Sequence, residues 1–198
     1  MKKRLHNSRR GRALLYALLL AVVILVSSET GFYCFLPQQA IQEEAEQQGI
    51  ETLEPVMWIQ GENPTGTGPA RLTLSAGERT LLFCPVKFCL RGGWNSGVWS
   101  IVETWEGEGP YFGVWQYTKT SATYVFGRAD DPAVETLTIH AQANNGTTWS
   151  REITPDWQEK DGGRYFIAEL NGAPLNWAYS VTGEDGKTVE IEHGYCWW

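Results

Sequence analysis

The first long run of hydrophobic positions lies near the N-terminus and follows a cluster of basic ones. Residues 13–26 contain no polar side chain except Tyr16, and six basic residues precede them: Lys2, Lys3, Arg4, Arg9, Arg10 and Arg12. A basic stretch followed by an apolar run is typical of an export signal whose N-terminus stays in the cytoplasm. We therefore expect the chain from residue 29 onward to be extracytoplasmic.

Two outcomes are open for this signal. The 14 residues of the apolar run would span about 21 Å as a helix, less than a membrane core of about 30 Å, and Val26-Ser27-Ser28 offers a cleavage site. Against cleavage, Ser27 and Ser28 can extend the helix, and the aromatic residues beside Cys34 suit the outer interface. We favour an uncleaved transmembrane helix over residues 13–28, which predicts a single-pass protein of the cell membrane with a cytoplasmic segment 1–12.

A short helical pattern follows the apolar run. Pro37 suits the first position of a helix, and Gly49 suits its C-terminal end. Ile41 and Ala45 lie one turn apart, so they form a narrow apolar stripe that needs another surface to lie on. We expect a short helix within a juxtamembrane segment 29–54.

From Pro55 onward the hydrophobic pattern changes to short alternating runs, which are typical of β-strands. Runs such as 71–74, 80–83 and 111–117 are separated by turns rich in glycine and proline. This pattern predicts a tryptophan-rich antiparallel sheet over residues 55–118, with the short helix packed on it.

The second half of the chain has more regular spacing. Asn145-Gly146 is a strong signal for a type I′ hairpin, and Gly183-Glu184-Asp185-Gly186 indicates another hairpin. Six or seven short strands at this spacing predict an immunoglobulin-like antiparallel β-sandwich over residues 119–198. The predicted fold class is therefore mainly β (α+β), with the transmembrane helix and the short helix before the sheets.

Charge is distributed unevenly and excludes one class of ligand. Beyond residue 28 the chain carries ten basic and twenty-three acidic residues. Binding to a phosphate backbone requires lysine and arginine to displace counterions, and here acidic residues outnumber basic ones by more than two to one, so the net charge repels phosphate. Nucleic acid is therefore excluded as a partner.

The cysteines are interpreted in the light of export. Cys84 and Cys89 are separated by four residues, and Cys196 lies third from the C-terminus. In an oxidising compartment nearby cysteines are usually joined, so a Cys84–Cys89 disulfide is expected, with pairing of either residue to Cys196 or free thiols as alternatives. The pair alone is a poor zinc signature.

The order of landmarks resembles that of a family of membrane-anchored surface proteins of Gram-positive bacteria that has no assigned activity. The likeness covers about residues 13–192 and rests on Pro37-Gln38-Gln39-Ala40-Ile41, Gly93-Trp94, Phe126-Gly127 with Asp131-Pro132, and Gly183-Glu184-Asp185-Gly186. It implies architecture and location only. Cys84, Cys89 and the Tyr195–Trp198 tail depart from the pattern.

Catalytic motifs are absent from the sequence. His6, His140 and His193 are scattered, and no zinc-protease, nucleophile-elbow or phosphate-loop motif occurs. The combination to test is His140 with Glu152, which would face it across the Asn145-Gly146 hairpin. We predict no enzymatic activity, no cofactor and no metal site.

Tryptophan is the feature best suited to ligand binding. Trp94, Trp99, Trp105 and Trp115 fall within 22 residues, and flat aromatic rings can either fill a β core or stack on a sugar. We predict a non-catalytic, membrane-anchored domain that binds an unknown surface protein or has a structural role. The alternative is a carbohydrate- or cell-wall-binding module that uses these four rings.

Overall fold

The computed structural model describes most of the chain. It covers residues 9–29, 33–50, 53–61, 70–90, 92–96, 100–104, 110–117, 121–184, 186–191 and 194–197, with the backbone alone at 9–10, 28–29, 101–104 and 194–197. Within these ranges the chain is mainly β, with two helices and antiparallel sheets, as predicted. The helices are α1 (Arg9–Glu29) and α2 (Pro37–Gln47).

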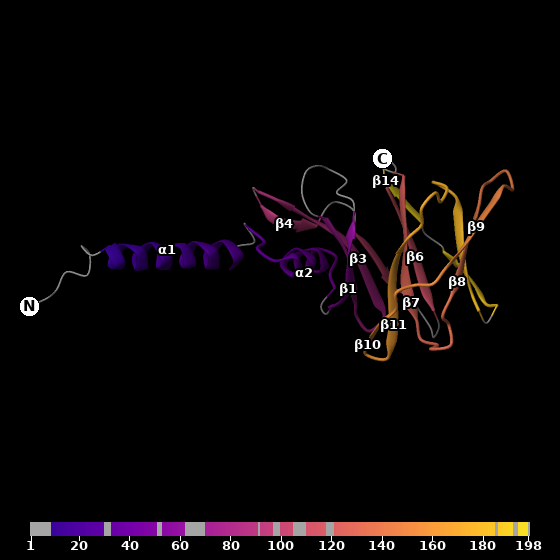
Figure 1. Ribbon diagram of the computed structural model, residues 1–198, viewed down its shortest axis with the longest axis horizontal. Helices are drawn as coiled ribbons and strands as arrows, with labels where there is room; N and C mark the ends of the chain where they lie inside the picture. Colours follow the sequence, from indigo (N-terminus) through magenta and orange to yellow (C-terminus); the bar gives the residue numbers. More distant parts are fainter. Residues whose placement is uncertain are drawn as a thin grey trace, which may run out of the picture.

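The strands form three sheets (Figure 1). Sheet A has the order β1-β2-β3-β4, and β5 is also paired to β3. Sheet B has the order β10-β11-β7-β6-β14. Sheet C has the order β13-β12-β8-β9. The strand bounds are β1 (Glu54–Gly61), β2 (Ala70–Ala76), β3 (Thr80–Cys89), β4 (Gly93–Ser96), β5 (Ile101–Thr104), β6 (Tyr111–Tyr117), β7 (Ala122–Ala129), β8 (Leu137–Gln142), β9 (Thr148–Ile153), β10 (Gln158–Lys160), β11 (Gly163–Glu169), β12 (Ala178–Gly183), β13 (Thr188–Ile191) and β14 (Gly194–Trp197). Among the described strands, every pairing is antiparallel except that of β14 with β6.

Sheet B is buried on both faces because it lies between sheets A and C. Side chains alternate along a strand, so neighbouring residues of β7 serve two different cores. Val125 packs toward sheet C, whereas Phe126 packs toward sheet A. The first core includes Phe112, Val114, Leu137, Ile139, Phe166 and Val181, and the second includes Leu72, Leu74, Leu81, Phe83, Trp115, Tyr117 and Ile167.

A third, smaller core lies under α2. Ala40, Ile41 and Ala45 pack against Leu82, Cys84 and Val86 on the outer face of sheet A. The helix begins at Pro37, as the sequence predicted, and its apolar stripe lies on a sheet.

The predicted immunoglobulin-like sandwich is not confirmed. Sheets B and C pack against one another, but sheet B also contains β6, which precedes residue 119, and β14 in parallel pairing. The predicted boundary at residue 118 falls between two neighbouring strands of this sheet, β6 and β7. The immunoglobulin-like topology therefore stays a prediction.

The hairpin at Asn145-Gly146 joins β8 to β9 as expected, but not through a type I′ turn. Gly146 has a φ of +84°, whereas Asn145 is not among the residues with positive φ, and a type I′ turn needs positive φ at both central positions. The Asn145 side chain instead accepts a hydrogen bond of 3.0 Å from the Thr147 amide.

The predicted membrane anchor is contradicted. Helix α1 projects away from the sheets with exposed apolar side chains such as Leu14, Leu18 and Val23 (Figure 1), yet no helix in the described part of the chain is both long enough and apolar enough to cross a membrane. The continuous apolar run of 14 residues accounts for about 21 Å of helix, against the roughly 30 Å that a span requires. The single-pass localisation is therefore wrong, whereas contact of residues 13–28 with a membrane stays a prediction.

The predicted disulfide is also wrong. Cys34, Cys84 and Cys89 are free thiols, and Cys84 and Cys89 lie on the same strand, β3. Five extended residues separate two Cα atoms by about 16 Å, whereas a disulfide needs about 4.4–6.8 Å. The alternative of pairing either residue with Cys196 is wrong as well, because Cys84 and Cys89 are both free.

The residues between the two cysteines do not turn because both sides of β3 are paired. Pro85 faces Leu72 on β2. On its other side it falls in the gap between the end of β4, opposite Val86, and the start of β5, opposite Phe83. Proline lacks the amide hydrogen that a central strand donates, so this gap is where β3 tolerates it.

Gly93 should be required for stability, because at this position β4 lies directly beside Cys34 in the segment that precedes α2. Its φ is +73°, and an added Cβ would lie 2.2 Å from the Cys34 carbonyl oxygen. Gly93→Ala should therefore lower the free energy of unfolding by more than about 2 kcal/mol, measured by urea denaturation.

Gly146→Ala is the matched control. Its φ of +84° is equally left-handed, but an added Cβ would meet nothing within 4 Å. A loss of about 1 kcal/mol is expected from the backbone strain alone. Equal losses in the two variants would contradict the close approach of β4 to Cys34.

Candidate functional site

The outer face of sheet A holds the candidate site. Residues alternate along β2, so Leu72 and Leu74 point into the core shared with sheet B. Arg71, Thr73 and Ser75 therefore point to the opposite side, where α2 lies. Helix α2 contacts β3 and β4, which leaves the outer face of β1 and β2 less covered.

An arginine lies between two tryptophan rings on this face. The Arg71 guanidinium carbon is 4.2 Å from the centre of the Trp58 ring and 5.1 Å from that of Trp94. Trp58 remains 56% exposed, whereas Trp94 is half-buried and packs edge-on against Phe88 at 5.8 Å. A guanidinium over an aromatic face contributes roughly 0.5–2 kcal/mol per contact, so the three side chains form one ordered platform.

The four tryptophans named from the sequence do not share a surface in the described part of the chain. Trp94 belongs to the platform, but Trp115 is only 2% exposed and packs between sheets A and B beside Phe83 and Tyr117. A ring buried there is not accessible to a sugar. Trp99 and Trp105 lie outside the described residues.

Sequence reasoning missed Trp58 and Arg71. Both stand in alternating strands, where the pattern shows two faces but not which face is covered. The signal that could have found them is the pairing of β1 with β2, which places Trp58 opposite Thr73 and Gln60 opposite Arg71. That register is not readable from either strand alone.

Glu44 fixes α2 beside the platform. Its carboxylate accepts hydrogen bonds from Ser96 Oγ at 2.7 Å, from Gln48 Nε2 at 3.2 Å and from Ser100 Oγ. Burial would raise the pKa of this carboxyl, but the hydrogen bonds from Ser100, Ser96 and Gln48 outweigh burial and lower the pKa below its ordinary value. The charged form therefore joins α2 to β4 and to the segment before β5.

The thiols under α2 are unreactive. Burial, followed by the hydrogen bond and charge of Glu43, raises the pKa of Cys34 to about 11, and Cys34 Sγ donates to Glu43 Oε1 at 3.2 Å. Burial, followed by the charge of Glu44, raises the pKa of Cys84 further. Only a thiolate acts as nucleophile or metal ligand, and both groups stay protonated at neutral pH.

A groove of about 310 Å³ lies beside the platform, between α2 and the paired strands β1 and β2. Its walls are mainly apolar, and they include Ile41, Ala45 and Ile50. Ser75 lies in its lining and is buried, with an exposure of 1%.

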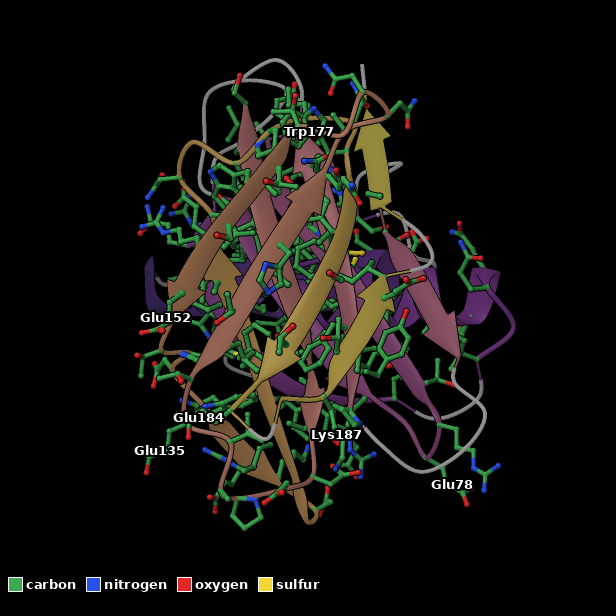
Figure 2. The ribbon with its side chains drawn as sticks, turned by 90° about the vertical axis from the view of Figure 1, so that its right-hand side faces the viewer. Glu78, Glu135, Glu152, Trp177, Glu184 and Lys187 are labelled. Atoms are coloured by element: carbon green, nitrogen blue, oxygen red, sulfur yellow. The ribbon has the colours of Figure 1, made fainter. Side chains whose placement is uncertain are left out.

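The outer face of sheet C, which faces the viewer in Figure 2, carries the sequence-predicted His140. It contains a hollow of about 570 Å³. Across this sheet, Ser150 and Ser180 flank His140, and Glu190 lies one strand beyond Ser180.

The suspected pairing of His140 with Glu152 is not formed. Glu152 stands opposite Thr138, two positions along the strand from His140. No hydrogen bond joins a histidine to a carboxylate within the described residues. The side chains of His6 and His193 lie outside these residues.

Comparison of the chain with models of protein families, with curated proteins and with solved structures finds no match. The resemblance to Gram-positive surface proteins therefore stays a prediction, and the functional argument rests on the geometry of this chain.

Glu44→Gln should destabilise the protein at neutral pH by about 1.5–3 kcal/mol, the usual worth of hydrogen bonds to a charged group. Because the folded-state pKa of Glu44 lies below its ordinary value of 4.5, its contribution is present above that pH and lost as pH falls through the folded pKa. Urea denaturation between pH 7 and pH 3 should show a weaker acid dependence in this variant.

Glu46→Gln, on the exposed side of the same helix, is the control. It removes an equal charge without touching Ser96 or Ser100, so its stability should follow that of the wild type at each pH. An unchanged acid dependence in Glu44→Gln would contradict the role assigned to the buried carboxylate.

Proposed function

We propose that the protein is a non-catalytic binding domain that contacts a protein partner through the platform of Trp58, Arg71 and Trp94. The observation that carries this proposal is the exposed Trp58 ring, 56% accessible, held against the Arg71 guanidinium. Tryptophan and arginine dominate the binding energy of protein interfaces, especially where they are ordered before binding.

The chemistry of the described residues supports binding without catalysis. Cys34 and Cys84 stay protonated because their pKa values are raised, and His140 lies between serines rather than beside a carboxylate. Catalysis needs an acid, base or nucleophile with a positioned partner. The platform instead offers a flat aromatic surface with one positive charge.

A glycan is the second candidate ligand. The exposed Trp58 ring also suits a glycan, because sugars stack their C–H faces on flat aromatic surfaces. If the ligand is a glycan, Trp58 and Trp94 stack on the sugar. The sequence suggested four tryptophans for this role, but Trp115 lies in the core. The two candidates share a surface but differ in the bound molecule.

A photocrosslinker at Gln60 tests the platform. Gln60 is exposed and stands opposite Arg71, so p-benzoylphenylalanine in its place should form a discrete adduct with a protein partner in extract from the source cells. Trp58→Ala in the same chain should reduce the adduct about 30-fold, the effect of losing a hot spot of about 2 kcal/mol. Gel shift and mass spectrometry give the readout.

Two controls accompany this experiment. The crosslinker at Glu152, on the outer face of sheet C (Figure 2), should form no such adduct, and Trp177→Ala should leave the Gln60 adduct unchanged. Adducts that persist in Trp58→Ala would exclude the platform. Trp58-dependent binding of the labelled chain to a glycan array, without a protein adduct, would instead favour the glycan candidate.

A further inference from the structure

The groove between α2 and strands β1 and β2 has an apolar interior and a polar group at its base. Ile41 and Ala45 line it from α2, Leu53 lines it from the segment before β1, and Pro55 lines it from β1 itself. Its volume of about 310 Å³ lies at the lower end of the range of small-molecule sites, roughly 300–1,000 Å³.

Ser75 supplies the polar group. Its side chain is 1% exposed, and its Oγ has no hydrogen-bond partner among the described residues. The hydroxyl of Thr73, two positions earlier on the same face of β2, donates to the Cys84 carbonyl oxygen at 2.7 Å. Buried hydroxyls are normally paired, so the unpaired Ser75 hydroxyl in the lining of a groove indicates a partner from outside the chain.

The rim of the groove is acidic. Glu54 forms an ion pair with Lys160, whose Nζ lies 2.6 Å from Glu54 Oε2. The hydrogen bond and the charge of Lys160 lower the pKa of Glu54. Glu46 also lines the groove and is exposed. It accepts a hydrogen bond from Gln42, but no cation pairs with it within the described residues.

We infer that this groove binds a small aromatic amine that carries a hydroxyl group at the end opposite to the amine. The apolar body packs against Ile41, Ala45 and Leu53, the hydroxyl pairs with Ser75 at the base, and the ammonium remains at the rim near Glu46. A carboxylate in place of the ammonium would be repelled there. This site is separate from the platform and does not rest on the proposed partner.

Tyramine and its close analogues test both contacts by calorimetric titration of the full chain. Tyramine should bind about fivefold more tightly than 2-phenylethylamine, which lacks the hydroxyl. It should bind about threefold more tightly than the uncharged 4-hydroxyphenylethanol, because an exposed ionic contact is weak. The anionic 3-(4-hydroxyphenyl)propanoate should bind more weakly than any of these.

Two variants assign the contacts to residues. In Ser75→Ala the preference for tyramine over 2-phenylethylamine should disappear, and in Glu46→Gln the preference for tyramine over 4-hydroxyphenylethanol should disappear. Ser75→Ala should also leave the unliganded protein as stable as the wild type or more so, because it removes an unpaired buried hydroxyl. A purely structural role of Ser75 predicts the opposite change in melting temperature.

Two further variants test whether tyramine binds in the groove and not at the platform. Gln42→Trp covers the groove from the exposed side of α2 and should abolish binding, whereas Trp58→Ala should leave tyramine binding unchanged. Failure of tyramine to bind at millimolar concentration would overturn the inference. So would a hydroxyl preference that survives in Ser75→Ala, or binding that survives in Gln42→Trp.

Discussion

Burial of both faces of sheet B is the constraint on which the rest of the structure depends. A sheet covered on both sides must be apolar at successive positions, and β7 is buried at every residue except Arg128. Sheets A and C each cover one face of sheet B, so each has only one inner face to fill with apolar side chains. Their outer faces are left free for other contacts.

The outer face of sheet A has two parts, one covered by α2 and one that carries candidate binding surfaces. Helix α2 covers the part formed by β3 and β4, where Leu82, Cys84 and Val86 form the third core. The buried Glu44 carboxylate holds the helix in that position through Ser96 and Ser100. The part formed by β1 and β2 carries Trp58 and Arg71, which Trp94 joins from β4, and the groove lies between this part and α2.

Three residues of one strand meet different environments on this divided face. Arg71 reaches between two tryptophan rings, Thr73 bonds to the carbonyl of its neighbour Cys84, and Ser75 lies buried without a partner in the described part of the chain. All three occupy equivalent positions of the β2 pleat. Their differences arise from what α2 and β1 place above them.

The sequence by itself determined the features that depend on neighbouring residues. Pro37 begins a helix because its ring sets φ and its missing amide hydrogen is not needed there. Gly146 ends up with positive φ in the hairpin between β8 and β9 because it has no Cβ. Alternating short runs were enough to predict a mainly β chain with a short helix before its sheets.

The tertiary structure decided the features that depend on residues distant in sequence. Trp58 and Trp115 both stand in strands, yet one is exposed and the other buried, because only Trp115 lies between two sheets. Cys84 and Cys89 remain apart because β2 and β4 hold the residues between them in an extended strand. Local patterns restrict the backbone of each segment, but only the packing of the sheets fixes which side chains are covered and which remain available to bind.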